Sequence, residues 1–367
     1  MCPDTVGVLG RSVGVEEEFL LVDPANGQVK AVGAAVLLAA DDTSDMAVEL
    51  QREQIETGTR PARDLAALGR ELRRTRAEAA DAARAVGAVP VALATYPLPV
   101  DPTTSPAPRF RRIVEGFGLT GSEQLTCGCH VHVAVDSQEE GVAALDRIRP
   151  WLAPLLAISA NSPFWNGHDS GYASFRSQVW GRWPSAGPTG LFGSPAGYRD
   201  LVHTMLATQT VFDDGMIYFD ARLSHRHPTL EVRVPDVCRE PEDALLLAAL
   251  TRALVETATR QWRADVPPDP IRPEVLRLAT WRAGRSGLEG QLLDPSHWRP
   301  APAADVVTSL VDHVAEALDD TGDRDLVDEL VHTLLGRGTG AARQRAVHAR
   351  TGDLKAVVLD ATHTHSQ

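Results

Sequence analysis

The sequence predicts an α+β fold in which neighbouring strands pair mainly antiparallel. Strand-like and helical segments are mixed along the chain, without the regular alternation that βαβ units require. Two strand-like segments, residues 218–224 and 229–235, follow each other closely enough to form a hairpin.

The composition, with 43% hydrophobic and 23% charged residues, is that of a globular protein. A chain of 367 residues can form two domains or one large one. We expect one domain over 1–367, with a core at about 12–295 and a helical region at about 300–367.

The N-terminal third carries clear strand and helix signals. Residues 12–23 contain β-branched and aromatic residues and run into a turn, which predicts a strand. Residues 46–57 are expected to form a second strand. Leucine and alanine recur at helical spacing within residues 61–86, which predicts a helix that Gly87 ends. The remaining elements expected here are a strand and a loop with five prolines, at residues 89–95 and 96–108.

The rest of the chain is interpreted in the same way. Residues 125–136 predict a strand, and residues 141–160 predict a helix that Pro150 and Pro154 should kink. Residues 161–198 are irregular, but their aromatic side chains argue for order, and an ordered loop of this length is usually functional. The other expected elements are a helix at 241–262 and a mostly helical C-terminal third, broken at Pro295 and Pro300.

The charged residues exclude some functions. The net charge is −13, which disfavours binding of nucleic acid or an anionic membrane through bulk charge. Lys30 and Lys355 are the only lysines among 36 basic residues, and neither belongs to a phosphate-binding P-loop. If the protein binds phosphates, arginines and metal ions must do so. Four cysteines are too few for a disulfide scaffold, and the N-terminus has no signal-peptide pattern. We therefore expect a cytoplasmic protein with small-molecule substrates.

The first candidate site lies within Gly14-Val-Glu-Glu-Glu18. Side chains alternate along a strand, so Glu16 and Glu18 share one face while Glu17 takes the other with Phe19. Adjacent carboxylates repel each other unless a cation lies between them, and Mg²⁺ prefers such oxygen ligands. The alternative is a solvated strand face.

The second candidate is the acidic run that contains Glu49, Glu53 and Glu56. On a regular strand Glu49 and Glu53 share a face and Glu56 takes the other, so a bend or bulge is needed to bring them together. A polar surface strand explains this segment equally well.

The third candidate is Cys127-Gly-Cys129-His130-Val-His132. Zinc is disfavoured because four ligands within six residues of one strand would point to opposite faces. We expect His130 and His132 to face a site and both cysteines to pack in the core. Two histidines satisfied on a polar face remain an alternative.

The fourth candidate is the pair of strands with Arg222 on one and Glu231 and Arg233 on the other. Glu231 suits a metal, and the planar guanidinium of Arg233 suits a phosphate or carboxylate. Cross-strand ion pairing is the alternative. Arg176, within the aromatic loop, is a further candidate for anion binding or a surface arginine stacked on Phe175. Together these signals fit a site for Mg²⁺-nucleotide and an acidic substrate.

Seven motifs occur in an order that resembles the carboxylate–amine ligases of the glutamate–cysteine ligase type 2 family. They are GVEEEFLLVD, ELQREQIETGT, CGCHVHVAV, NSPFWNGHDSGYASFRSQVWGRWP, YFDARLS, PTLEVRVPDV and RSGLEGQLLDP. The resemblance runs from about residue 13 to 295. It implies a glutamine-synthetase-like catalytic domain, in which helices cover the outside of a curved, mainly antiparallel sheet that forms a funnel.

The resemblance also implies an activity and a set of site residues. The expected enzyme is an ATP-dependent ligase that activates a carboxylate as an acyl phosphate and releases ADP and phosphate as an amine attacks. The expected substrates are glutamate and cysteine, or another amine. The expected cofactors are ATP and Mg²⁺, with Mn²⁺ possible, and a homodimer is expected at family level. The implied roles are metal binding by Glu16, Glu18, Glu56, His130 and Glu231, nucleotide binding by His132, Arg222 and Arg233, and catalysis by Arg176, Arg222 and Arg233.

Two alternatives stay open at this point. One is a non-catalytic homologue that binds nucleotide or amino acid. The other is a metal-dependent amidohydrolase with a His-x-His motif, although its histidines are expected nearer the N-terminus than residue 130.

Overall fold

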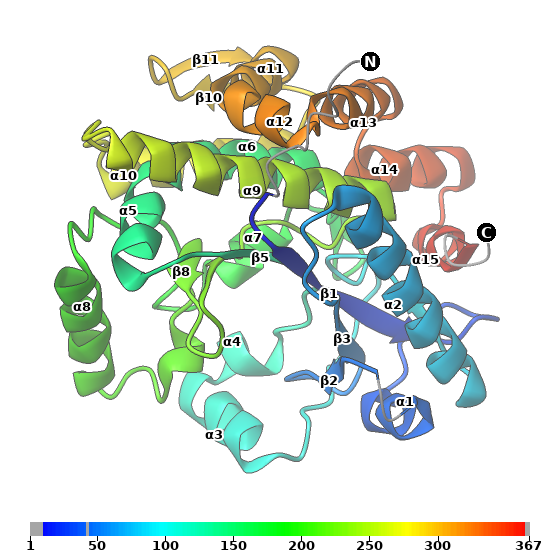
Figure 1. Ribbon diagram of the computed structural model, residues 1–367. Coiled ribbons are helices and arrows are strands. Elements are labelled where there is room, and N and C mark those ends of the chain that lie inside the picture. The colour runs from blue at the N-terminus through cyan, green and yellow to red at the C-terminus, as the bar shows by residue number, and fades with distance from the viewer. Residues whose placement is uncertain (1–9, 42–43, 364–367) are drawn as a thin grey trace.

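In the computed structural model, which describes residues 10–41 and 44–363, a seven-stranded antiparallel sheet forms the centre of the protein (Figure 1). Its strands are β1 (Val13–Val22), β2 (Met46–Val48), β3 (Gln54–Gly58), β4 (Val89–Val91), β5 (Cys129–Ala134), β8 (Ala221–Leu223) and β9 (Thr229–Val232). Their order is β2-β3-β1-β5-β9-β8, and β4 pairs with the end of β1. Every pairing within this sheet is antiparallel, which confirms the predicted α+β class.

Helices cover one face of the sheet. They are α2 (Leu65–Ala85), α5 (Gln138–Ile148), α6 (Leu152–Ser159) and α9 (Pro241–Arg263). Helix α9 packs on β1 and β5, α2 packs on β1 and β3, and α5 packs beside β8 and β9. Figure 1 shows α9 crossing above the strands. No helix of the described ranges is long and apolar enough to cross a membrane.

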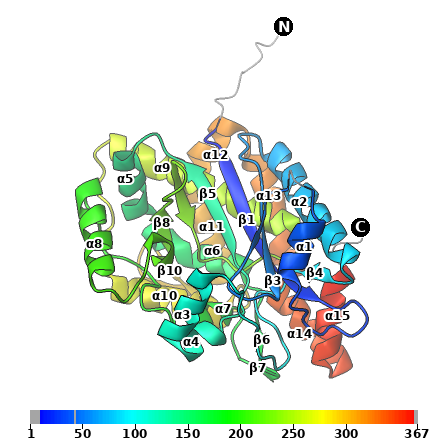
Figure 2. The same ribbon diagram turned by 90° about the horizontal axis from the view of Figure 1, so that it is seen from below.

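The other elements surround this core. The other α-helices are α1 (Gly33–Ala39), α3 (Pro108–Phe117), α4 (Leu119–Ser122), α7 (Arg176–Trp180), α8 (Pro195–Ala207), α10 (Pro273–Ser286), α11 (Ala303–His313), α12 (Ala315–Thr321), α13 (Arg324–Arg337), α14 (Gly340–Thr351) and α15 (Leu354–Thr362). Two small hairpins are β6 (Phe164–Trp165) with β7 (His168–Asp169) and β10 (Gln291–Asp294) with β11 (Arg299–Pro302). Helices α3, α4 and α8 lie at the margin of the sheet face opposite α9 (Figure 2).

The period-two alternation of the strands divides the sheet into an apolar and a polar face. Val131 and Val133 of β5 and Leu230 and Val232 of β9 join one hydrophobic cluster with α5, α6 and α9. The residues between them therefore point to the other face. This cluster also includes side chains of α11, α12 and α13, as far as Leu334.

Glu17 lies on the helical face, as the alternation predicts, and α2 neutralises it. Its carboxylate accepts hydrogen bonds from Arg76, with Nη2–Oε1 at 2.5 Å and Nε–Oε2 at 2.9 Å. Both side chains are buried. Because an isolated buried carboxylate would be costly, this ion pair allows a glutamate beneath the helix layer.

Several expected elements are confirmed with narrower bounds. The predicted 61–86 helix is α2, which begins at Leu65 because the Asp64 carboxylate caps its N-terminus, accepting from the amides of Ala66 and Ala67. The predicted 141–160 helix is interrupted at Pro150 by a 3₁₀ turn (Arg149–Trp151) between α5 and α6. Pro154 lies in the first turn of α6, where proline is tolerated.

The expectation of one strand over 46–57 is wrong. The segment turns back on itself, and β2 pairs antiparallel with β3. The turn is held from outside, because the amide of Arg52 donates to the carbonyl of Thr103 at 2.8 Å. Helix α3 and the β10–β11 hairpin were not predicted, since α3 follows a proline-rich loop and β11 itself contains two prolines.

Candidate functional site

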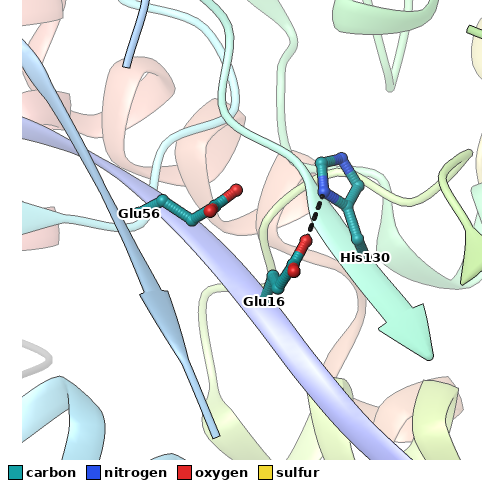
Figure 3. Close-up of side chains that lie close together, drawn as sticks. All are labelled: Glu16, Glu56 and His130. Atoms are coloured by element: carbon teal, nitrogen blue, oxygen red, sulfur yellow. Dashed lines mark ion pairs between the residues drawn. The ribbon is translucent and has the colours of Figure 1, made fainter. Parts of the chain in front are cut away.

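The polar face of the sheet brings four predicted residues of β3, β1 and β5 together through strand register. Glu18 of β1 lies opposite Glu56 of β3, and Glu16 of β1 lies opposite His130 of β5. Figure 3 shows Glu16, Glu56 and His130 pointing toward one another from three neighbouring strands. Glu16 Oε2 lies 3.4 Å from His130 Nδ1. The register thus forms an acidic row that reaches His130 of β5.

The same row continues across β9 and β8. His132 of β5 lies opposite Glu231 of β9, which in turn lies opposite Arg222 of β8. Glu231 accepts from Arg222 Nε at 2.7 Å and Nη2 at 3.1 Å, and from Arg233, which directly follows β9. All three side chains of this ion-pair network are buried. The row therefore runs from carboxylates at β3 to guanidinium groups at β8.

This row lines a cavity with a volume of about 620 Å³. That volume is within the range of small-molecule sites. Its acidic and basic lining includes every predicted site residue except Arg176: Glu16, Glu18, Glu56, His130, His132, Arg222, Glu231 and Arg233.

The bend between β2 and β3 decides which of the second group of glutamates reach the cavity. Glu49 follows β2 and lines the cavity with Glu56. Glu53 does not line it, because its carboxylate caps the amide of Thr103 at 3.0 and 3.1 Å. Because the chain bends between β2 and β3, Glu49 and Glu56 line the same cavity, which one regular strand would not allow.

Three groups of side chains are arranged as metal ligands would be. Within each group the ligand atoms lie within 4.8 Å of one another, and the groups are Glu16–Glu56–His130, Glu16–His132–Glu231 and Glu18–Glu49–Glu56. Glu16 and Glu56 each belong to two groups. These oxygen-rich sets with one or no histidine suit a hard divalent cation.

The raised pKa values of two glutamates indicate that the acidic end of the row is short of positive charge. Burial and then the charge of Glu18 raise the pKa of Glu49 to about 8. Burial and then the charge of Glu49 raise the pKa of Glu56 well above its ordinary value. A divalent cation between these carboxylates would remove both the repulsion and the penalty for ionisation.

The histidines differ from each other. Burial and then Arg233 lower the pKa of His130, so its ring is neutral and able to act as a ligand. Burial opposes the charge of His132, but the Glu16 carboxylate, whose Oε2 lies 3.3 Å from His132 Nε2, raises the pKa of His132. His130 Nδ1 and Nε2 and His132 Nε2 are buried without a hydrogen-bond partner of good geometry among the described residues. Unpartnered ring nitrogens beside carboxylates fit a metal-binding role.

Arg176 lies outside the set of residues that line the cavity. It is 2% exposed, and its guanidinium donates to the carbonyls of Arg233 and Val234 at 3.4 and 3.2 Å and lies 3.9 Å from Asp236. A Cβ at Gly128 would lie 2.4 Å from Arg176 Nη2, so the glycine of Cys-Gly-Cys is needed for this packing. Its predicted contact with substrate stays a prediction.

Sequence reasoning missed an aromatic wall beside the row. Phe110, Trp180, Trp183 and Tyr218 line the cavity, and the rings of Trp180 and Tyr218 lie 4.8 Å apart. Arg233 lies over both of these rings, at 5.6 and 6.0 Å. The density of aromatic residues in 161–198 indicated an ordered segment. It could not indicate that Trp180 and Trp183 meet Phe110 and Tyr218, because these two come from distant segments.

The three described cysteines are free and buried. Cys129 joins the cluster beneath the helices, and the position of Cys127 in a second core cluster agrees with the core packing expected for both. We expect the double variant Cys127→Ala/Cys129→Ala to keep its metal content and turnover, with a stability loss of a few kcal/mol at most, about that of a small cavity. Metal analysis and a turnover assay of the purified variant check this. Loss of a stoichiometric zinc ion would contradict the geometric argument against zinc.

Known protein sequences match nearly the whole chain. The model of the glutamate-cysteine ligase family 2 (GCS2) matches residues 12–360. A Streptomyces avermitilis protein provisionally named glutamate–cysteine ligase 2-1 is 54% identical over 354 residues, which cover 95% of this chain and 98% of the relative. A Streptomyces coelicolor protein provisionally named glutamate–cysteine ligase 2 is 53% identical, with coverage of 95% and 97%.

Solved structures share the fold at low sequence identity. A glutamate–cysteine ligase from Francisella tularensis, crystallised in complex with AMP, superposes with a TM-score of 0.69 at 14% identity and covers 98% of this chain and 89% of that one. A bifunctional glutathione synthetase from Pasteurella multocida gives 0.68 at 15% identity, with coverage of 97% and 52%. These similarities confirm the predicted fold.

Proposed function

This chain belongs to the glutamate-cysteine ligase family 2 and is an ATP-dependent carboxylate–amine ligase of that type, and we propose that its cavity joins glutamate to an amine through an acyl phosphate. One observation supports this most strongly. The cavity lining carries candidate metal-ligand groups and an arginine–glutamate network on a single sheet face, and Glu231 belongs to both. Phosphoryl transfer needs this combination of positioning and charge neutralisation. Neither alternative considered above is favoured by the family match.

The donor set fits divalent cations. Glu16, Glu18, Glu56, His130 and Glu231 would hold Mg²⁺ or Mn²⁺, and Glu49 and His132 would complete two of the groups. When bound, such ions neutralise the charge on phosphate oxygens. The three groups are consistent with more than one ion.

The two ends of the cavity differ in chemistry, which suggests where each substrate binds. At the Glu231–Arg222 end the cavity adjoins a smaller pocket of about 280 Å³, and the two share Asp214, Arg222, Ser224 and His225. Apolar side chains of that pocket, such as Leu206 and Leu223, offer a surface for a nucleotide base. We assign this end to ATP. The end at Glu18 and Glu49 then receives the carboxylate and the amine.

The reaction can be described from the residues of this chain. A carboxylate oxygen of the substrate attacks the γ-phosphorus of ATP, ADP leaves, and the amine nitrogen then attacks the acyl carbon, displacing phosphate and losing a proton. Arg233 Nε has no hydrogen-bond partner among the described residues, and its side chain lines the cavity, so it is available to a phosphoryl oxygen. Glu231 holds the guanidinium groups of Arg222 and Arg233 in place for this role.

The direct test is a turnover assay with ATP, Mg²⁺ and glutamate, with cysteine or a panel of other amines. We expect ADP, phosphate and a new amide in equal amounts with at least one amine, identified by mass spectrometry. Glutamate-dependent ADP formation without an amide would support acyl phosphate formation and show that the amine is a different one. Absence of ATP turnover with every amine would contradict glutamate as the carboxylate.

The pKa of Glu49 predicts how pH affects stabilisation by metal. Its ordinary value is 4.5 and its value in the fold is about 8, so the unfolded chain loses this proton before the folded protein does. The metal-free protein should therefore lose stability from this group between about pH 4.5 and 8. Mg²⁺ removes the cost of ionisation, so we expect it to raise Tm more at pH 8 than at pH 6. Thermal unfolding of wild type and Glu49→Gln checks this, and an equal pH dependence in both would assign it to other groups.

The homodimer and the cytoplasmic location expected from the sequence stay predictions. So does the single-domain organisation over 1–367.

A further inference from the structure

The turn between β8 and β9 borders the cavity at its Arg222 end. Ser224, His225, Arg226 and His227 all line the cavity, and the last three are exposed. The two strands that this turn joins carry Arg222 and Glu231. A group held by the turn is therefore fixed to the same hairpin as the arginine–glutamate network.

Arg226 differs from the other arginines of the cavity wall. Arg109 is held by Asp213 at 2.7 and 2.9 Å, and Glu231 holds Arg222 and Arg233. Within the part of the chain that the structure describes, Arg226 pairs with no carboxylate, and its side-chain hydrogen bond is to His225 Nε2 at 3.2 Å. Its positive charge is therefore available to an anion.

The backbone of the turn is ordered by local hydrogen bonds that do not involve the Arg226 guanidinium. Ser224 Oγ accepts from the amides of Arg226 and His227, each at 3.3 Å. The amide of Ser224 donates to the carbonyl of Thr229 at 2.9 Å, which closes the turn. A guanidinium on such a turn can meet phosphate oxygens with two parallel N–H groups.

We infer that Arg226 binds the polyphosphate of ATP and thereby sets the affinity for nucleotide. This inference rests on the proposed function, which places ATP at this end. Two observations favour phosphate over the substrate carboxylate. The turn runs into Thr229, whose Oγ1 lies 3.1 Å from His132 Nδ1, so the turn lies near His132. Glu18 and Glu56, in contrast, lie toward the other end of the row. The adjoining pocket also shares Ser224 and His225 with the cavity, so a nucleotide base there would leave its phosphates beside Arg226.

The test compares the binding of ATP, ADP and adenosine to wild type, Arg226→Ala and Arg226→Lys in Mg²⁺ by calorimetry. Because charge-assisted hydrogen bonds are stronger than neutral ones, Arg226→Ala should weaken ATP and ADP about 10- to 100-fold and leave adenosine within about twofold. Arg226→Lys should lie between, since lysine keeps the charge but loses the planar fork. In turnover, KM for ATP should rise with a small change in kcat. Arg299→Ala, an exposed arginine on β11, is the matched control and should bind all three like wild type.

The outcomes separate this inference from the proposed function. Unchanged ATP affinity in Arg226→Ala, with a wild type that binds and turns over ATP, would overturn the inference alone. A raised KM for glutamate with unchanged ATP affinity would also overturn it and assign Arg226 to the carboxylate. Equal weakening of adenosine and ATP would indicate a loss of structure at the turn instead of a lost phosphate contact. A wild type that binds no ATP would overturn both proposals.

Discussion

Glu231→Gln is expected to lower ATP turnover at least about 100-fold. Loss of a group that only orients a metal ligand typically lowers metal affinity or activity about 10- to 100-fold. Loss of a direct ligand should therefore lower turnover more. Glu231 belongs to the candidate ligand group that contains Glu16 and His132, and it also pairs with Arg222 and Arg233. The arginines hold the pKa of its buried carboxyl well below the usual range, so it is ionised at any working pH. A steady-state assay at saturating ATP and Mg²⁺ measures the effect, and near-wild-type turnover would contradict the assignment.

The same variant should also be less stable. Sequence alone suggests that a glutamate on a polar strand face can be replaced without disturbing the core. The structure shows instead that Glu231 is 2% exposed and neutralises two buried guanidinium groups. Breaking a buried ion pair by removing one partner costs about 3–5 kcal/mol. Urea unfolding of the purified variant measures this loss.

Glu17→Gln separates the two effects. It breaks a comparably buried pair, with Arg76, on the helical face of the same sheet. We expect a similar loss of stability but turnover close to wild type in the folded protein. If Glu17→Gln lost turnover as severely as Glu231→Gln, the loss would reflect stability and the site assignment would be wrong.

Alternation along strands is why sequence reasoning found most of the row. Val131 and Val133 must face the helices, so His130 and His132 must face away from them, whatever the strands pair with. The same reasoning separated Glu17 from its neighbours. The face of each side chain was therefore predictable, because it depends on local geometry alone.

Which of those residues meet could not be predicted from periodicity. The contact of Glu18 with Glu56 depends on the register between β1 and β3, and the place of Glu49 depends on a turn that Thr103 holds from a distant loop. Strand periodicity contains neither piece of information. The position of Arg176 beneath Gly128 is likewise a matter of packing between segments 48 residues apart in the sequence.

Glu16→Gln is the second large effect that we expect. Glu16 belongs to two ligand groups, with Glu56 and His130 and with His132 and Glu231, whereas Glu49 belongs to one. Removing its charge should weaken two metal positions together. We therefore expect turnover to fall at least about 100-fold and excess Mg²⁺ to restore little of it. Loss of a direct metal ligand should lower activity more than loss of a group that only orients a ligand.

Glu49→Gln provides the matched comparison, because it should shift the Mg²⁺ dependence of turnover to higher concentration and recover much of its turnover at saturating Mg²⁺.

A second measurement tests the charge pairing of Glu16 independently of activity. Glu16 raises the pKa of His132 through a contact of 3.3 Å, so the histidine pKa followed by NMR should fall in Glu16→Gln. The cost in stability should be small, since Glu16 is one-third exposed and, unlike Glu231, leaves no buried guanidinium without its partner. An unchanged His132 pKa, or full rescue of Glu16→Gln by Mg²⁺, would show that Glu16 does not link the two metal positions.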